Sequence, residues 1–158
     1  MHCMIIKFEK LNEHAKTPTQ ATEGSAGFDL YATKDVVIGP GETVVIDTGL
    51  KFEIPHGHLM YISSKSGLAR HFGVHVLNSP ALIDSDYRGE VSVILHKAND
   101  VAITDVSNIG RAGQSYYIRK GDKVAQFVIL PYQKLILLEG QVDVNTERGE
   151  GGFGSTGR

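Results

Sequence analysis

The chain has 158 residues, of which 41% are hydrophobic and 22% are charged, and its formal net charge is −2. This length suits one domain with a sizeable core, and the charge balance argues against a protein that binds nucleic acid directly. The single cysteine, Cys3, excludes an internal disulfide and a cysteine-rich zinc site. We therefore expect a cytoplasmic protein, and we expect no membrane association because no apolar run is long enough to span a bilayer.

Short strand patterns occupy the first third of the chain. Residues 26–32, Ala-Gly-Phe-Asp-Leu-Tyr-Ala, predict a strand that carries one inward polar residue, Asp29. Residues 36–38 and 44–46 flank a glycine- and proline-rich turn and predict a strand on each side of it. Residues 51–54 alternate polar and apolar side chains, which is typical of a half-buried strand.

The rest of the chain continues this pattern, with one exception. Ser66–Phe72 predicts a short helix, and no alternation of strands with long helices follows, which argues against a Rossmann or P-loop fold. Short strands separated by turn residues favour an antiparallel sandwich, jelly roll or barrel. Further strands are predicted at 59–62, 74–77, 90–96, 124–130 and 135–138.

Residues 99–117 mix small, polar and β-branched side chains without a sustained period. We interpret this stretch as a long loop or an added hairpin, and its length alone favours a solvated excursion without a role. The sequence shows no internal repeat and no linker. We therefore expect residues 1–158 to form a single domain that contains this insertion.

Two carboxylates lie close together in residues 82–89, Leu-Ile-Asp-Ser-Asp-Tyr-Arg-Gly. If this stretch is extended, Asp84 and Asp86 share one face, because side chains alternate along a strand. Neighbouring carboxylates can divide catalytic work, one acting as a base and the other as a structural partner. Composition alone favours the other interpretation, a turn in which Asp and Ser side chains bond their own backbone.

Two further segments carry polar groups suited to a ligand. In residues 64–70, Ser-Lys-Ser-Gly-Leu-Ala-Arg, either a phosphate binds at the start of the helix, or Ser64 or Ser66 simply caps it. Residues 120–122 predict a turn, and Gln126 is an amide in an otherwise apolar strand. Such an amide needs hydrogen-bond partners, so Gln126 should bond either backbone or a ligand.

The histidines offer two pairs at chelating spacings, His56 with His58 and His71 with His75. Each pair straddles a turn or loop, and no third ligand is suggested nearby in the sequence. Zinc sites in proteins commonly use three or four protein ligands, so we do not predict a structural zinc site.

The last eleven residues, 148–158, contain five glycines between two arginines. Glycine permits the backbone conformations that fold N–H groups into anion-binding nests, and Arg148, Ser155 and Thr156 add donors suited to phosphate. Phe153 offers a flat face on which a base can stack. The alternative is a frayed terminus, as glycine-rich ends often are. Polyphosphate and base together point to a nucleotide.

Five segments, in this order, resemble the five motifs of the trimeric deoxyuridine triphosphatases (dUTPases). The similarity covers nearly the whole chain, from Ile5 to Arg158, and five matches in register are far more specific than any one of them. The matching segments are 26–30, 64–69, 78–89, 121–126 and 148–157.

This resemblance implies a jelly-roll β-fold, a homotrimer and Mg²⁺-dependent hydrolysis of dUTP to dUMP and diphosphate. The reaction would limit uracil incorporation into DNA and supply dUMP for dTMP synthesis. Each active site would draw on three subunits, and the swapped glycine-rich arm, residues 148–158, would close over a neighbour's site as a gate.

The resemblance also implies roles for residues of the third motif and of the strand that follows it. Asp84 would activate the water that attacks the α-phosphate, and Tyr87 would pack under the deoxyribose and exclude a 2′-hydroxyl. Asn78 would read the uracil edge together with backbone groups of its hairpin. The substrate pocket would be completed by Leu82, Ile83 and Ser92.

The other four motifs would hold the phosphates and the metal. Ser66 would bond the phosphates near the scissile linkage, with Lys65 and Gly67 beside it, and Gln126 would help to hold them. Asp29 would reach the Mg²⁺ through water. The arm would bind the outer phosphates and cover the uracil through Arg148, Phe153, Gly154, Ser155 and Thr156.

Three positions depart from the usual motifs. Lys65 and Lys123 stand where the family commonly has arginine, and lysine lacks the bidentate guanidinium fork. Ala81 stands where a glycine is usual. The stretch 99–117 is longer than is common, as in some phage members, so a phage origin, with the host cytoplasm as its location, and a regulatory protein partner for this stretch are hypotheses.

Two rival functions remain compatible with these motifs. A dCTP deaminase-like enzyme would share the fold and release ammonia from the cytosine ring. A nucleotide-sensing module would bind the nucleotide and use the insertion to hold a regulatory protein.

Overall fold

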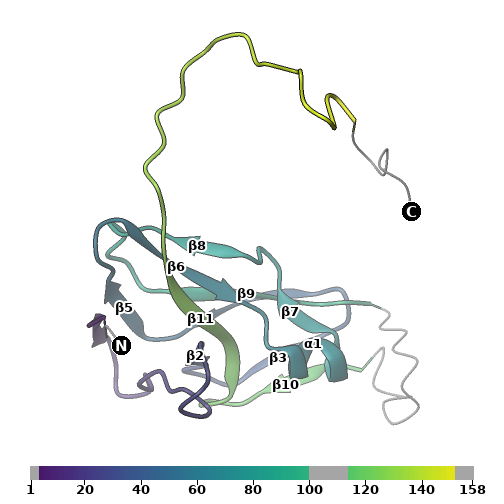
Figure 1. The fold of residues 1–158 in the computed structure, drawn as a ribbon. Coiled ribbons are helices and arrows are strands. Elements are labelled where there is room, and N and C mark those ends of the chain that lie inside the picture. The colour runs from purple at the N-terminus through teal and green to yellow at the C-terminus, as the bar shows by residue number, and fades with distance from the viewer. Residues whose placement is uncertain (1–3, 100–113, 152–158) are drawn as a thin grey trace.

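The structure is a computed structural model that describes residues 4–99 and 114–151 (Figure 1). It shows an all-β, jelly-roll-like fold with one short helix. The elements in chain order are β1 (Lys7–Lys10), β2 (Phe28–Tyr31), β3 (Val36–Ile38), β4 (Thr43–Asp47), β5 (Leu50–Glu53), β6 (His58–Ser63), α1 (Ser66–Phe72), β7 (Val74–Val76), β8 (Ala81–Ile83), β9 (Ser92–Lys97), β10 (Tyr116–Ile118) and β11 (Lys123–Pro131).

The strands of the described chain pair in antiparallel fashion. One sheet has the order β2-β11-β6-β8, and a second has the order β4-β9-β7. The pairs β1–β5 and β3–β10 form two small sheets. Because β2 lies beside β11, this topology places the first and fourth of the five segments next to each other, although they are far apart in the sequence.

Alternation along the strands builds the core. In β9 the side chains of Val93, Leu95 and Lys97 are buried, and the residues between them are half-buried. Removing inward apolar side chains from water stabilises the fold by about 25 cal/mol per Å² of apolar surface. The fully buried apolar side chains include Leu30, Ile38, Ile46, Leu50, Met60 and Ile118.

The predicted helix is confirmed, because α1 spans Ser66–Phe72. It ends at Gly73, whose φ of 65° lies in the left-handed region that glycine adopts without strain. The strands predicted at 36–38, 51–54 and 59–62 correspond to β3, β5 and β6, with small shifts at their ends. Turn residues therefore located most elements correctly.

The strand predicted at 135–138 is wrong. After β11 the chain leaves the body as an irregular arm (Figure 1), and the side chains of Leu135, Ile136, Leu137 and Leu138 are 74%, 93%, 92% and 93% exposed. A strand needs a neighbour for its backbone N–H and C=O groups, and no segment of the described chain pairs with this one. The run is apolar as the sequence indicates, but the described residues leave it exposed.

The insertion predicted at 99–117 is described only at its ends, because residues 100–113 lie outside the described residues. Tyr116 and Tyr117 belong to β10, which pairs with β3, with Tyr116 opposite Ile38. The loop interpretation is therefore wrong for these two residues. A regulatory protein partner for this stretch stays a prediction.

Candidate active site

A polar row crosses three neighbouring strands. Asp29 of β2 lies opposite Gln126 of β11, and Gln126 lies opposite Ser63 of β6. Directly paired residues of antiparallel strands point to the same face, so these side chains form one row. The structure thus brings together Asp29 and Gln126, which the sequence had placed in different motifs.

Two lysines hold the carboxylate of Asp29, which is only 4% exposed. Its Oδ1 accepts a hydrogen bond from Lys65, and its Oδ2 lies 2.7 Å from Lys123 Nζ. Burial alone raises the pKa of Asp29, but hydrogen bonds from Lys123 and Lys65 outweigh burial and lower the pKa below its ordinary value. The same contact raises the pKa of Lys123. The ammonium groups of Lys65 and Lys123 are therefore both paired with the single carboxylate of Asp29.

Lys65 is also the N-cap residue of α1, and no side chain caps the helix. The interpretation that Ser64 or Ser66 caps α1 is therefore wrong. Ser64 Oγ instead accepts a hydrogen bond from the backbone N–H of Val76 at 2.9 Å. The hydroxyl of Ser66 makes no hydrogen bond within the described part of the chain. Gly67 faces open space, since an added Cβ would meet no atom within 4 Å.

A pocket of about 390 Å³ includes this row. Asp29, Lys65 and Gln126 line it, and Gln126 Nε2 donates a hydrogen bond to Ser64 O at 3.4 Å. The lining itself holds one cation, Lys65, and one anion, Asp29. Lys123 pairs with Asp29 from outside the lining and leaves the cluster of Asp29, Lys65 and Lys123 with one excess positive charge, which suits an anionic ligand. The sequence had not singled out five other lining residues, Ala21, Ser25, Ser63, Phe127 and Val128.

Asp84 opens a tight turn directly after β8. The backbone N–H of Tyr87 donates to Asp84 O at 3.2 Å. Arg88 closes the turn, because its Nη1 donates to Ser85 O at 2.7 Å and to Tyr87 O at 2.9 Å. The turn interpretation of this segment is therefore correct for its backbone, although an arginine rather than an acid makes the side-chain bonds.

The idea that Asp84 and Asp86 share one face of an extended strand is wrong. Strand pairing ends at Ile83, and the backbone turns immediately afterwards, so the alternation rule does not apply. Both residues are exposed, and the carboxylate of Asp84 makes no hydrogen bond with the described residues. Asp84 can therefore accept a proton from a ligand or a water molecule.

Tyr87 is positioned by its own turn. Its Oη donates a hydrogen bond to Glu90 O at 2.9 Å. An added Cβ at Gly89 would collide with this hydroxyl, so the position accepts no side chain without moving the ring. A side chain at position 89 would therefore displace the ring of Tyr87.

Asp84 and Tyr87 line a second pocket, of about 380 Å³. Ser92 lies in it as well, and its Oγ donates to Asp47 Oδ1 at 3.2 Å. Ile94 was missed, although it lies two residues beyond Ser92 on the same face of β9 and could have been found by alternation. The lining is completed by the predicted Leu82 and Ile83 and by the unpredicted Val45, Glu90 and Val91.

Asn78 is exposed and lies in the turn between β7 and β8, outside the lining of this pocket. Arg148 lies in the arm, where its Nε donates to Gly151 O at 2.8 Å. Figure 1 shows that the arm arches away from the body of the chain. Phe153, Gly154, Ser155 and Thr156 lie outside the described residues, so their roles stay predictions.

The two pockets lie toward opposite ends of one strand pair. β6 and β8 run antiparallel, with Met60 opposite Ile83. Asp84 continues β8 past that end, whereas Lys65 follows β6 beyond the other end. In this register Asp84 corresponds to Leu59, so six residues at about 3.3 Å each separate the two backbones by about 20 Å. A single chain therefore does not bring its exposed carboxylate and its cationic pocket onto the same ligand atom.

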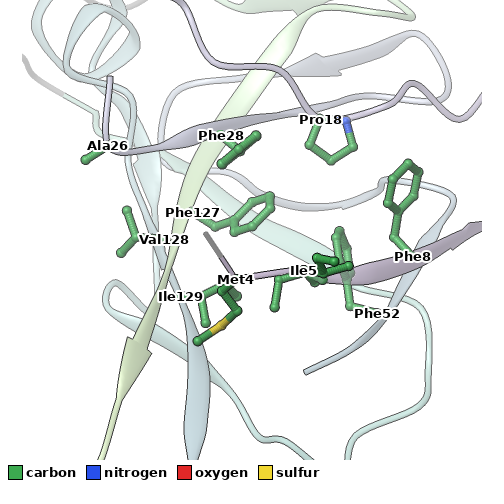
Figure 2. A pocket seen from close by; sticks show the side chains of 11 residues that line it. Met4, Ile5, Phe8, Pro18, Ala26, Phe28, Phe52, Phe127, Val128 and Ile129 are labelled. Carbon is green, nitrogen blue, oxygen red and sulfur yellow. The ribbon is translucent and has the colours of Figure 1, made fainter. Parts of the chain in front are cut away.

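An apolar groove of about 540 Å³ lies between the N-terminal segment and β11 (Figure 2). The rings of Phe28 and Phe127 stack with centroids 5.7 Å apart, and Phe52 packs edge-on against Phe127 at 5.5 Å. Phe8 and Phe28 remain 41% and 37% exposed. The edge of β1 that faces away from β5 has no partner strand among the described residues.

Comparison with known proteins identifies the family. A family model for dUTPase matches residues 13–157, which include all five segments. The chain belongs to the dUTPase family. The deoxyuridine 5′-triphosphate nucleotidohydrolase of Nautilia profundicola is 43% identical over 155 residues, which cover 98% of this chain and all of that protein.

Solved dUTPase structures share the fold. A variant of the Staphylococcus bacteriophage 80alpha dUTPase with dUpNHpp matches with a TM-score of 0.82 and 26% identity, covering 98% of this chain and 99% of that one. The dUTPase of phage phi11 of S. aureus, in a structure that describes a structural Mg(II) ion, matches with a TM-score of 0.74 and 27% identity, covering 88% and 98%. The dUTPase family and the jelly-roll fold inferred from the motifs are confirmed.

Residues 4–99 and 114–151 contain no helix that is both long and apolar enough to cross a membrane.

Proposed function

We propose that this protein hydrolyses dUTP to dUMP and diphosphate in active sites that are each assembled from three copies of the chain. The observation that supports this most is the separation of the exposed Asp84 carboxylate from the cationic pocket around Lys65. Hydrolysis needs the attacking atom and the phosphorus within about 3.5 Å of each other. Two copies that bring these two ends together meet that requirement, and one copy does not.

Asp84 acts as the general base. Its exposed carboxylate accepts a proton from a water molecule, and the oxygen of that water attacks the α-phosphorus in line. The bond from the α-phosphorus to the bridging oxygen breaks, and diphosphate leaves with the bonding electrons. The products are dUMP and diphosphate.

The pocket beside Asp84 holds the deoxyuridine. Leu82 and Ile83 offer apolar contacts, and the ring of Tyr87 fills the space in which a 2′-hydroxyl would otherwise fit. Asn78, with backbone groups of its hairpin, pairs with the uracil edge. A cytosine would leave these groups unpaired, and unpaired buried groups are a strong source of discrimination.

The cationic pocket of a neighbouring copy binds the phosphates. Lys65, Ser66 and Gln126 contact them, and Asp29 keeps Lys65 and Lys123 side by side. A lysine ammonium acts as a point charge, so the paired lysines supply charge where a guanidinium would supply a fixed fork. The arm of a third copy contributes Arg148, Gly154, Ser155 and Thr156 to the outer phosphates and Phe153 to the uracil.

Magnesium would enter the site with the nucleotide. The described residues contain no cluster of three acidic, histidine or cysteine side chains that could cage an ion, and Asp29 is already paired with two lysines. Such a site fits Mg²⁺, which keeps several waters and binds substrate phosphates, with Asp29 reaching it through water. When bound, the ion neutralises charge on the triphosphate.

The groove in Figure 2 supports the homotrimer. Residues 135–138 expose four apolar side chains, and the phenylalanine-lined groove with the unpaired edge of β1 offers apolar contact and backbone partners. We place residues 135–138 of a second copy there. The cellular role that follows is limitation of uracil in DNA and supply of dUMP for dTMP synthesis, in the cytoplasm, where deoxynucleotides are made.

Diphosphate release from dUTP, dCTP, dTTP and UTP, measured with and without Mg²⁺, tests the activity. We expect Mg²⁺-dependent turnover of dUTP and little turnover of the others. Ammonia release from dCTP would instead identify a deaminase, and binding of dUTP without turnover would identify a sensing module.

Asp84→Asn is expected to lower kcat by about 10³-fold, within the usual range for loss of a general base, and to leave dUTP binding largely intact. Steady-state kinetics and binding of a non-hydrolysable dUTP analogue measure the two effects. Asp86→Asn is the matched control, since Asp86 lies in the same turn and outside the pocket lining. Equal losses in both variants would remove Asp84 from this role.

Mixing two defective variants tests the shared site. Asp84→Asn inactivates the half-site that holds the general base, and Lys65→Met inactivates the half-site that binds the phosphates. Unfolding and refolding the two variants together should create some active sites in which both half-sites are intact. Random assembly of equal amounts restores about a quarter of the wild-type activity if the halves come from different copies. Activity no higher than that of either variant alone would show that one chain supplies both halves.

A further inference from the structure

A second polar row, away from both pockets, crosses the sheet formed by β4, β9 and β7. Thr43 of β4 lies opposite His96 of β9, and His96 lies opposite His75 of β7. The three side chains therefore point to one face. All belong to neighbouring strands, but the two histidines are too far apart in the sequence for a spacing rule to connect them.

The two imidazoles lie at the separation expected for a shared metal ion. Their ring centroids are 5.4 Å apart, and their planes meet at 75°. With metal–nitrogen distances of about 2.0 Å and tetrahedral angles, two ligating imidazoles have centroids about 5 Å apart. Neither ring is fully buried, so an ion can reach them from solvent.

Thr43 prepares one of the two rings for ligation. Its Oγ1 lies 3.0 Å from Nδ1 of His96. When this hydroxyl accepts the Nδ1–H, the lone pair of His96 is on Nε2, the nitrogen that remains for a metal. Such hydrogen bonds fix the orientation and tautomer of ligating histidines in metalloproteins. His75 makes no ring-nitrogen hydrogen bond with the described residues, so it is available as the second ligand.

We propose that His75 and His96 bind one divalent transition-metal ion of the zinc type, with water in the remaining positions. Imidazole nitrogen suits Zn²⁺, Cu²⁺ and Ni²⁺, whereas Mg²⁺ prefers oxygen. The ion joins β7 to β9, on the same face of β9 as Ser92 and Ile94, which line the Asp84 pocket. With two protein ligands it is held more weakly than in a structural zinc site of three or four ligands, and it takes no part in hydrolysis.

Titration calorimetry of the full chain with Zn²⁺ tests this site. The protein is first freed of metal with a chelator and then kept in excess Mg²⁺, so that oxygen sites are already occupied. We expect one Zn²⁺ per chain at the tightest site. His75→Gln and His96→Gln should each weaken it by about tenfold or more, and Thr43→Val by a smaller factor.

His56→Gln and His58→Gln are the matched controls, because they remove imidazoles from a loop elsewhere on the surface. We expect both to bind Zn²⁺ as the wild type does. A tight site that survives His75→Gln and His96→Gln, or one that depends on only one of the two, would overturn the proposal.

A spectrum of Cu²⁺ bound to the wild-type chain tests the site without relying on variants, which could fold poorly. The spectrum of bound Cu²⁺ should show coupling to two imidazole nitrogens. Coupling to one imidazole would count against a two-histidine site.

Discussion

The carboxylate of Asp29 explains how two lysines function where the family commonly has arginines. Each of its oxygens pairs with a different ammonium, so neither Lys65 nor Lys123 needs a bidentate fork to be held in place. The buried acid holds both ammonium groups beside each other. In the proposed site, a residue expected only to reach a metal through water would thus also position the lysines that bind phosphate.

Asp29→Asn tests this role through stability. Because the folded-state pKa of Asp29 is lowered, its ionised form contributes stability that is present above the unfolded-state pKa of about 4 and is lost as the pH falls through the folded-state value. We expect the variant to be about 2 kcal/mol less stable at pH 7, with a deficit that shrinks below about pH 4. Denaturant unfolding across this range measures it, and a deficit independent of pH would contradict the ion-pair explanation.

Gly89→Ala tests the placement of Tyr87. The added methyl group collides with the phenolic hydroxyl, so the ring must move and lose its bond to Glu90 O. We expect weaker discrimination between dUTP and UTP, by about tenfold, because the space for a 2′-hydroxyl opens. Comparison of kcat/KM for the two nucleotides measures this. Tyr87→Phe, which keeps the ring, is the control for loss of the hydroxyl alone.

At the scale of elements, α1 depends on its surroundings more than on its own sequence. It has seven residues, none of them buried, and isolated helices of this length are unstable in water. Its end is secured at Gly73, whose backbone N–H bonds Ala69 O and whose carbonyl accepts from the N–H of Ala98 at 3.0 Å. Lys65, Ser66 and Gly67 lie at the start of this helix. The bonds at Gly73, which hold the opposite end of the helix, therefore also help to fix the position of these three residues.

Gly73→Ala should therefore destabilise the protein. A side chain in the left-handed region is strained, and we expect a loss of about 1 kcal/mol. Thermal unfolding measures this as a lower Tm. Gly67→Ala is the control for stability, because it lies in the same helix with ordinary backbone and open space around it. An equal loss of stability in both variants would show that backbone strain is not the cause.

At the scale of the whole molecule, a single copy is incomplete in two ways. Its pockets lie toward opposite ends of β6 and β8, and its arm exposes an apolar run that the body does not cover. In the proposed homotrimer, association of copies would resolve both, because it would join the two half-sites and bury the run. Residues 135–138 would then serve assembly, and residues 148–158 would serve catalysis.

Deletion of residues 148–158 tests assembly and dUTP turnover separately. Residues 135–138 remain, so we expect the truncated protein to assemble as the full chain does. Turnover of dUTP should fall by about 10²-fold or more, because the outer phosphates lose charge-assisted hydrogen bonds and the site is no longer closed. Light scattering and diphosphate release measure the two properties. A truncated protein that no longer assembles would show that the end of the arm is structural.

The sequence by itself determined the local elements and the family. Alternation and turn residues predicted β3, β5, β6 and α1, and five ordered segments indicated a dUTPase before any contact was known. These signals are local, since each depends on side chains a few residues apart. The residues proposed for hydrolysis, above all Asp84 and Lys65, were visible for the same reason.

Only the tertiary structure decided which of these residues meet. It paired Lys65 and Lys123 with Asp29. It showed that Ser64 bonds the backbone of Val76 and does not cap the helix. It also showed that the chain turns at Asp84, where alternation predicted a continued strand. It also left residues 135–138 unpaired among the residues it describes, and it placed His75 opposite His96. Strand order and register bring together residues that are distant in the chain, and no local pattern encodes that choice.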